Sequence, residues 1–327
     1  MRCVVTGATG FIGSHLAESL LNEGHEVLCP VRDPRKHEYL NSSRAKIIAL
    51  DRLEGEIRSN NKFDYFFHLA GATRALNYEG YWSANVELTN YLLDLISKSF
   101  DLQRFKRFVF VSSQAVSGPA PDHNSCISEY DVPRPVSLYG RSKLEAEQVV
   151  KQYGDVIPYV IIRPSTVFGP RDTDVLELFK SCKYRITLCL TGRQRQVSVV
   201  FVEDLVTGIK RAAFLSKSVN ETYFITNPEP VVWRQFVADI AELMGVHTII
   251  LPIPGVILKS LGFFADIIGN FLGKPFLFRS EKIAEIDQWY WICSSQKAYH
   301  DLGWAPQNSL KENLKKTLDW YNNEGWI

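Results

Sequence analysis

The stretch Thr6-Gly7-Ala8-Thr9-Gly10-Phe11-Ile12-Gly13 is the strongest local signal in this chain. A short apolar run, residues 3–6, leads into it, and an amphipathic segment over residues 14–22 follows. Glycines between a strand and a helix permit a tight turn, close approach of the backbone to a pyrophosphate, and close packing of helix on sheet. The stretch therefore predicts a dinucleotide-binding turn rather than a merely structural one, with these contacts to the cofactor: Gly7, Thr9, Gly10, Phe11, Ile12 and Gly13.

Short apolar runs alternate with longer amphipathic segments from residue 2 to about residue 163. The runs cover residues 3–6, 26–28, 46–49, 65–69, 108–111 and 159–162. Continuous apolar runs indicate strands that are covered on both faces, and helical patterns between them indicate βαβ crossovers. The sequence predicts an α/β fold with a doubly wound parallel sheet.

The regular alternation of strands and helices ends after Gly169-Pro170, where helical patterns with scattered short strands begin. We therefore predict a dinucleotide-binding domain over residues 1–170 and a smaller α/β substrate-binding lobe over residues 171–327. Later strands near residues 199–202 and 223–226 could belong to either part, because a late strand can return to the first sheet.

Composition and charge exclude several classes of protein. The chain has 327 residues, which is enough for about two lobes. Hydrophobic residues make up 46% and charged residues 22%, as in folded globular proteins, so disorder is not the main state. The 37 basic and 36 acidic residues leave a formal charge of +1, which argues against a nucleic-acid partner.

Cysteine usage and hydropathy indicate a cytoplasmic protein. The six cysteines form no CxxC pair and no zinc-ligand spacing, so we expect a reducing compartment and no metal site. Met1 is followed at once by a strand-like run, so no signal peptide is expected. The longest uncharged stretch, Leu243–Leu258, contains two prolines and is shorter than the ~18 residues of a membrane span. We therefore expect no span.

The end of the second predicted strand bears on which dinucleotide binds. A carboxylate there would accept both ribose hydroxyls of NAD, whereas a cation would bind the 2′-phosphate of NADP. Val31 stands where this carboxylate would be expected, and Arg32, which follows it, could bind the phosphate with the help of Arg35 or Lys36. We predict NADP(H) in preference to NAD(H), although Asp33 could turn back toward the ribose. Asp51, after the third strand, is either a contact to the adenine amino group or an ordinary loop carboxylate.

Three residues form a candidate catalytic group. Tyr139 and Lys143 are four residues apart in a predicted helix, so the ammonium shares a face with the phenol and would lower its pKa. Ser113 follows the strand at residues 108–111, at the sheet edge where ligands bind, and could hydrogen-bond a substrate oxygen. The pair Tyr139 and Lys143 would be weak evidence alone, and the position of Ser113 makes it specific.

Together these residues resemble the Ser-Tyr-Lys group of the extended short-chain dehydrogenase/reductase family. The resemblance implies hydride transfer at nicotinamide C4, with Tyr139 as acid or base, Lys143 lowering its pKa and holding the ribose, and Ser113 polarising the substrate. It also implies further cofactor contacts at Leu69, Ala70, Asn85, Pro164 and Val167. Further matches to the family lie at residues 68–71, 85–90, 163–170, 202–205 and 297–306.

Residues that differ between members of that family indicate which reaction this chain catalyses. Its dehydratases carry carboxylates directly after the catalytic Ser or Thr, where this chain has Gln114-Ala115. Its nucleotide-sugar epimerases have Asn and Arg where this chain has Thr166 and Val197, although Arg193 and Arg195 could compensate. The chain looks more like the branch of dihydroflavonol reductases and 3β-hydroxysteroid dehydrogenases.

We therefore predict an NAD(P)-dependent oxidoreductase acting on a small-molecule carbonyl or alcohol. A nucleotide-sugar epimerase with transient oxidation by bound NAD is the alternative. A non-catalytic dinucleotide-binding protein is a second alternative, which the intact Ser113, Tyr139 and Lys143 argue against.

Two segments suggest interactions. Residues 254–278 are rich in Phe, Leu and Ile, and Lys259, Asp266, Asn270 and Lys274 share one helical face. We interpret the segment as a helix packed on the core, with an apolar substrate wall or a membrane-docking surface as alternatives.

The family resemblance also implies a homodimer. Its interface would be a four-helix bundle of the 85–99 segment and the helix that carries Tyr139. Leu92, Leu93 and Ile96 have the required helical spacing but could equally face the chain's own sheet.

Overall fold

A seven-stranded parallel sheet forms the centre of the computed structural model, which describes residues 1–35, 37–40, 44–192, 194–273, 276 and 279–327. Its strand order is β11-β6-β5-β4-β1-β2-β3, and every neighbouring pair is parallel. The predicted doubly wound sheet is confirmed. Its strands are β1 (Arg2–Thr6), β2 (Glu26–Val31), β3 (Lys46–Ala49), β4 (Tyr65–His68), β5 (Arg107–Val111), β6 (Tyr159–Pro164) and β11 (Glu221–Ile225).

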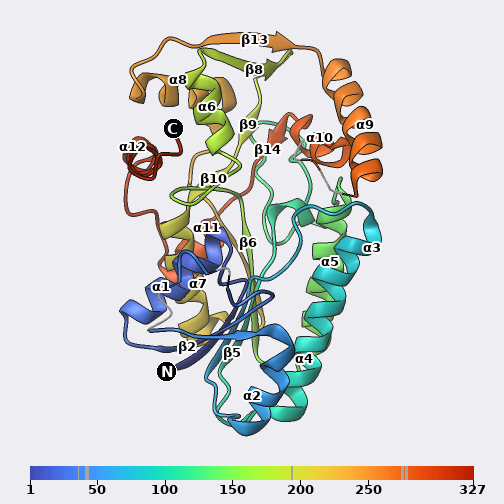
Figure 1. Ribbon diagram of the computed structural model, residues 1–327, viewed down its shortest axis with the longest axis vertical. Helices are drawn as coiled ribbons and strands as arrows, with labels where there is room; N and C mark the ends of the chain where they lie inside the picture. Colours follow the sequence, from blue (N-terminus) through green and yellow to red (C-terminus); the bar gives the residue numbers. More distant parts are fainter. Residues whose placement is uncertain (36, 41–43, 193, 274–275, 277–278) are drawn as a thin grey trace.

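Helices cover both faces of this sheet (Figure 1). Alternate residues of a strand point to opposite faces, so Val5 packs in the core beneath α1 and α7, and Val4 in the core beneath α2 and α4. The continuous apolar runs of the sequence follow from this two-sided burial. These helices are α1 (Phe11–Asn22), α2 (Leu53–Ser59), α3 (Tyr78–Trp82), α4 (Leu88–Ser99), α5 (Leu138–Gln152), α7 (Val202–Phe214) and α11 (Gln296–Leu302).

Short helical segments interrupt the connections. The π-helix η2 (Ser83–Glu87) joins α3 to α4, and the 3-10 helices are η1 (Leu50–Arg52), η3 (Gln114–Val116) and η4 (Ser216–Ser218).

The chain beyond residue 170 does not stay in one lobe. β11 returns to the large sheet beside β6, and α7 and α11 pack in the same core as β1. In contrast, β10 pairs with β7 in a separate two-stranded sheet. The remaining elements are β7 (Thr166–Phe168), β8 (Ile186–Leu190), β9 (Gln196–Val197), β10 (Val199–Phe201), β12 (Val231–Val232), β13 (Ile249–Ile253), β14 (Tyr290–Trp291), α6 (Leu176–Lys183), α8 (Trp233–Leu243), α9 (Gly255–Leu272), α10 (Ser280–Ile286) and α12 (Leu310–Asn323).

The candidate dimer residues are buried within this chain. Leu92, Leu93 and Ile96 of α4 are fully buried in the core that contains Phe66 and Phe108. The alternative in which they face the chain's own sheet is therefore the one observed. These side chains cannot supply a dimer contact, and a homodimer stays a prediction.

Helix α9 differs from the expectation that it packs on the core. Within this helix only Gly262 and Gly269 are buried, while its large apolar side chains are exposed. By length and composition α9 could cross a membrane. The sequence-based search passed over it because Lys259 and Asp266 interrupt the apolar run. Of the four polar residues predicted to share one face, Lys274 lies outside the described residues.

Candidate active site

The glycine-rich turn leaves no room for side chains at two of its glycines. A Cβ atom on Gly13 would lie 2.1 Å from the carbonyl oxygen of Gly7, and one on Gly7 would lie 2.7 Å from the amide nitrogen of Ala70. Gly7 also has a φ of +72°, a conformation that favours glycine. These contacts hold the start of α1 tightly against the ends of β1 and β4.

The start of α1 fits the pyrophosphate of a dinucleotide. Gly10 caps the helix without a side chain, and its own N–H donates to the carbonyl of Gly7 at 2.9 Å. The first N–H groups of a helix lack partners within that helix and attract an anion. The turn thus provides backbone donors where side chains would obstruct a ligand.

The other predicted cofactor contacts lie at the carboxyl ends of strands in this sheet or beside it. Leu69 and Ala70 directly follow β4, and Asp51 lies exposed in η1 after β3. Pro164 ends β6, and Val167 lies in β7. Because parallel strands end at one edge, the sheet brings residues from distant parts of the chain to the same side as the glycine-rich turn.

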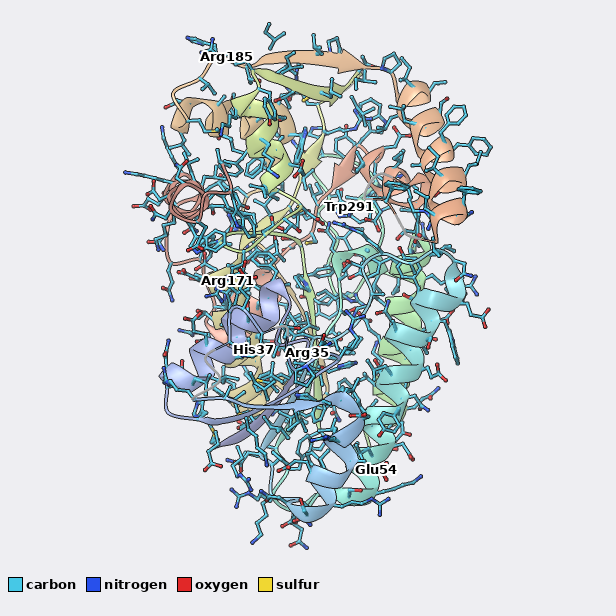
Figure 2. The ribbon with its side chains drawn as sticks, in the orientation of Figure 1. Arg35, His37, Glu54, Arg171, Arg185 and Trp291 are labelled. Atoms are coloured by element: carbon cyan, nitrogen blue, oxygen red, sulfur yellow. The ribbon has the colours of Figure 1, made fainter. Side chains whose placement is uncertain are left out.

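The basic turn after β2 is arranged differently from the prediction. Arg32 is exposed directly after the strand. Arg35, expected to assist it, instead makes a bidentate ion pair with Asp33, at 2.9 and 3.0 Å, and Figure 2 labels its side chain. Lys36, the other expected helper, lies outside the described residues. Only Arg32 of the expected cations is therefore presented without a competing ion pair in the described chain.

Ser113 and Tyr139 come together although they are far apart in sequence. Ser113 follows β5, and its hydroxyl accepts a hydrogen bond from the Ala115 amide at 3.1 Å. Tyr139 lies in the first turn of α5, which Ser137 caps by accepting from the Gly140 amide. The Ser113 hydroxyl lies close enough to the Tyr139 phenol to act on its pKa. A strand end and a helix start therefore place two hydroxyls side by side.

Lys143 lies one helical turn further along α5 but binds another partner. Its ammonium donates to the carbonyl of Val111 at 2.7 Å and lies 4.3 Å from the centre of the Phe110 ring. Burial lowers the pKa of Lys143 to about 7, against a smaller opposing effect of Glu147.

The expected lowering of the Tyr139 pKa by Lys143 is not found. Burial raises the pKa of Tyr139 to about 12, the hydrogen bond with Ser113 acts in the opposite direction, and the carboxylate of Glu285 raises it further. A lysine whose pKa is near 7 is only partly charged at neutral pH, so it stabilises a phenolate weakly. In this structure Tyr139 is a neutral phenol that can donate a proton.

Asn85 positions the site rather than presenting its amide to a ligand. It is buried in the π-helix η2, and its Nδ2 donates to Ala72 O at 3.1 Å and to Ser142 Oγ at 2.9 Å. Its Oδ1 accepts from the Ala72 amide. Asn85 thereby ties the loop after β4 to helix α5, next to Lys143.

A buried ion pair also connects helix α5 to the end of strand β6. Arg163 at the end of β6 binds Glu147 of α5 with two hydrogen bonds, at 2.6 and 2.9 Å. Both side chains are almost fully buried. Such a bidentate pair fixes the position of α5 relative to the strand that ends beside the candidate cofactor site.

Sequence reasoning missed two carboxylates from the far C-terminal region. Glu281 of α10 accepts from the Tyr139 amide at 2.6 Å, and Glu285 accepts from Ser137 Oγ at 2.6 Å. Burial raises the pKa of Glu281, while its bond with the Tyr139 amide opposes this. The two glutamates are four residues apart, which is a helical spacing, but no motif connects them to Tyr139 more than 140 residues earlier.

These features agree with what known proteins show. The profile described as "NAD dependent epimerase/dehydratase family" matches residues 3–225, which include the glycine-rich turn, Ser113, Tyr139 and Lys143. The chain belongs to the NAD dependent epimerase/dehydratase family. It is thus an NAD(P)-dependent enzyme of the oxidoreductase or epimerase type, and its resemblance to the extended short-chain dehydrogenases is confirmed.

Relatives in the epimerase/dehydratase family differ in their reactions. Ceramide reductase of Caulobacter vibrioides is 25% identical over 99% of this chain and 95% of its own. Sterol-4-alpha-carboxylate 3-dehydrogenase (decarboxylating) of Candida albicans is 25% identical over 98% and 97%. The crystal structure of UDP-glucose 4-epimerase from Thermotoga maritima superposes with a TM-score of 0.80 at 22% identity, over 99% of both chains. That similarity extends the shared fold to the whole chain.

Proposed function

We propose that this protein is a reductase or dehydrogenase that interconverts a carbonyl and an alcohol on an apolar substrate. The observation that carries the proposal is that Ser113, which directly follows β5, and Tyr139, in the first turn of α5, come together at the carboxyl edge of the sheet with Tyr139 as a neutral phenol. Both hydroxyls can bind one carbonyl oxygen. Gln114 and Ala115 follow Ser113, so the site lacks the adjacent acid and base that water elimination would require.

The chain's own groups supply the proton chemistry. When bound, the dinucleotide supplies or accepts the hydride at nicotinamide C4. In the direction of reduction, the Tyr139 hydroxyl gives its proton to the carbonyl oxygen, and the Ser113 hydroxyl stabilises the negative charge that develops there. Glu281 holds the Tyr139 backbone, and Asn85 holds the loop opposite it. The neutral state of Tyr139 suits proton donation to the carbonyl oxygen.

Several observations favour this reaction over nucleotide-sugar epimerisation. Thr166 and Val197 occupy positions where such epimerases have Asn and Arg. Arg195, which could have compensated, lies over the Trp289 ring at 4.3 Å and binds Asp287. Arg193 lies outside the described residues. The curated relatives include enzymes named for ceramide and for a sterol carboxylate, which supports an apolar substrate here.

We also propose that NADP(H) is the preferred cofactor. Arg32 is exposed directly after β2, where a cation can bind the 2′-phosphate. The carboxylate of Asp33, which could have accepted the ribose hydroxyls of NAD, is held by Arg35 instead.

Removal of the Tyr139 hydroxyl tests the proposed reaction. Tyr139→Phe is expected to lower kcat about 10²–10⁴-fold for reduction of apolar ketones, because the proton donor is lost. Binding of NADPH, measured by fluorescence titration, is expected to stay within about twofold of the wild type. Tyr130→Phe is the matched control, since Tyr130 is 82% exposed and is none of the candidate site residues. Undiminished turnover by Tyr139→Phe would refute the proposal, as would rapid epimerisation of UDP-glucose by the wild type.

Arg32→Ala tests the choice of cofactor. It is expected to weaken NADPH binding about tenfold or more while leaving NADH binding unchanged, because one charge-assisted phosphate contact is lost. Arg35→Ala, which removes a neighbouring cation already paired with Asp33, is expected to have a smaller effect. Tighter binding of NADH than of NADPH by the wild type would contradict the prediction.

A further inference from the structure

Helix α9 turns its polar side toward the protein. Lys259 binds Asp287 at 2.8 Å, and Asp266 binds Arg279. Arg279 also reaches Asn270 Oδ1 at 3.4 Å. These polar residues of α9 recur at intervals of four and seven, which places them on one helical face.

Small residues complete this inward face. Gly262 is buried so closely that a Cβ atom would lie 2.4 Å from the Ile283 side chain and 3.0 Å from the Ser280 amide, both in α10. Gly269 is also buried. The inward face of α9 is therefore polar and small, and it packs on α10.

The outward face of α9 is apolar and exposed. Phe271 is 89% exposed, Val256 75%, and Phe263 and Phe264 59% each. A helix on the surface of a soluble protein normally does the reverse, burying its apolar face and exposing its polar one. A contiguous apolar surface of this kind marks a site of interaction. The other members of this outward face are Ile257, Leu261, Ile267, Ile268 and Leu272.

The two-stranded sheet next to α9 shows the same inversion. In β8, Ile186 and Leu188 are exposed, while Thr187 between them is buried and bonds with Ser181 and Thr248. Its partner strand β13 exposes Ile249 and Leu251 and ends at Ile253, just before α9 begins at Gly255. Figure 1 shows β8 and β13 at one end of the molecule, with α9 descending from that end along its flank. The apolar surface thus continues from the strands onto the helix.

The charge of these segments identifies the kind of partner. Lys183 and Arg185 are exposed directly before β8, next to the exposed Ile186, and within the described residues neither of them is held in an ion pair. Arg185, just before β8, lies at the same end of the molecule (Figure 2). Basic side chains beside an apolar surface complement the headgroups and acyl chains of an anionic bilayer.

We propose that the outward face of α9, together with the exposed side chains of β8 and β13, docks this protein on an anionic lipid bilayer. The helix lies along the bilayer surface and does not cross it, because Lys259 and Asp266 remain bound to Asp287 and Arg279 of the same chain. This surface stands close to the candidate active site. Helix α9 packs on α10, whose Glu281 accepts from the Tyr139 amide.

Vesicle flotation with the full-length protein tests this proposal. The probes are vesicles of phosphatidylcholine alone and of phosphatidylcholine with about 30% phosphatidylglycerol. We expect the wild type to float with the anionic vesicles and to bind neutral ones more weakly. The double variant Phe264→Asp, Phe271→Asp is expected to lower the partition coefficient at least about tenfold, since two inserted rings are lost. Raising the salt concentration should weaken binding further.

A control variant, an activity assay and light scattering distinguish the possible results of the flotation experiment. Tyr130→Asp with Val132→Asp changes two other highly exposed apolar residues and should float like the wild type. Reduction of a water-soluble ketone should be equal in all three proteins, which separates this test from that of the proposed reaction. Failure of the wild type to float would overturn the proposal, as would undiminished flotation of the Phe264→Asp, Phe271→Asp variant. Light scattering that shows a dimer dissociated by this variant would assign the surface to a second copy and also overturn it.

Discussion

The large sheet and helix α9 both carry closely spaced phenylalanines, yet they place them in opposite environments. Phe66 and Phe67 of β4 are fully buried, whereas Phe263 and Phe264 of α9 are more than half exposed. In the sheet, helices on both faces cover every side chain of the strand, so apolar sequence and burial agree. In α9, ion pairs and two buried glycines hold the polar face toward the protein, so the apolar side chains of this helix are the exposed ones. Hydrophobicity alone therefore does not report burial in this protein.

The strongest test of this contrast compares one ring from each region. Phe67→Ala is expected to lower the free energy of unfolding by about 3–5 kcal/mol, because it leaves a cavity in the core. Phe271→Ala should change it by no more than about 0.5 kcal/mol, because its ring is already 89% exposed. Urea denaturation followed by circular dichroism measures both. Comparable losses would mean that α9 is packed in solution and would remove the contrast.

Unlike Lys259 of α9, which is exposed and paired with Asp287, Lys143 is buried in the sheet lobe. Its folded pKa of about 7 is below the unfolded value, so the unfolded state binds more protons between pH 7 and about 10. Stability arising from this group therefore rises with pH across that window. Lys143→Met, which removes the group, should raise Tm by about 5 °C at pH 6 and by progressively less toward pH 10.

Calorimetry at several pH values checks this expectation. Lys259→Met serves as the control, since this lysine is exposed and paired with Asp287 rather than buried. A constant difference between the wild type and Lys143→Met would contradict the assigned pKa.

The smallest expected effect concerns the attachment of α9. Asp266→Ala removes the ion pair with Arg279 and should lower the free energy of unfolding by about 1 kcal/mol, because both side chains are largely shielded from water. Asp94→Ala removes an exposed pair with Lys98 on α4 and should cost about 0.3–0.5 kcal/mol. If Asp266→Ala cost no more than Asp94→Ala, the inward polar face would not be what orients the helix.

Local patterns predicted the sheet and brought forward the candidate catalytic group, because both depend on residues that are close in the sequence. The runs at residues 65–69 and 108–111 mark strands by their continuous apolar character, and the Gly7–Gly13 turn is fixed by contacts within a few residues and with the adjacent strand. The sequence could place Ser113 near Tyr139 because Ser113 follows a strand and Tyr139 lies at the start of the next long helix. Parallel strands bring such positions to one edge.

Long-range contacts account for what the sequence did not predict. Glu281 reaches the Tyr139 amide only because α10 packs against α5, and nothing near residue 281 indicates that partner. A local contact accounts for one further difference, since Arg35 was expected at a phosphate but pairs with Asp33 two residues away. The Tyr139 pKa was expected to fall and instead rises, because burial outweighs a lysine that is itself only partly charged.

The sequence by itself determined the parallel sheet and the glycine-rich turn, and it predicted Ser113, Tyr139 and Lys143 as the candidate catalytic residues. Each depends on residue type at a short spacing, which a strand or a helix converts directly into geometry. Only the tertiary structure decided which face of α9 meets the protein. A helical pattern defines two faces but not their environments, and the partners that select one face, Arg279 and Asp287, lie beyond the helix itself.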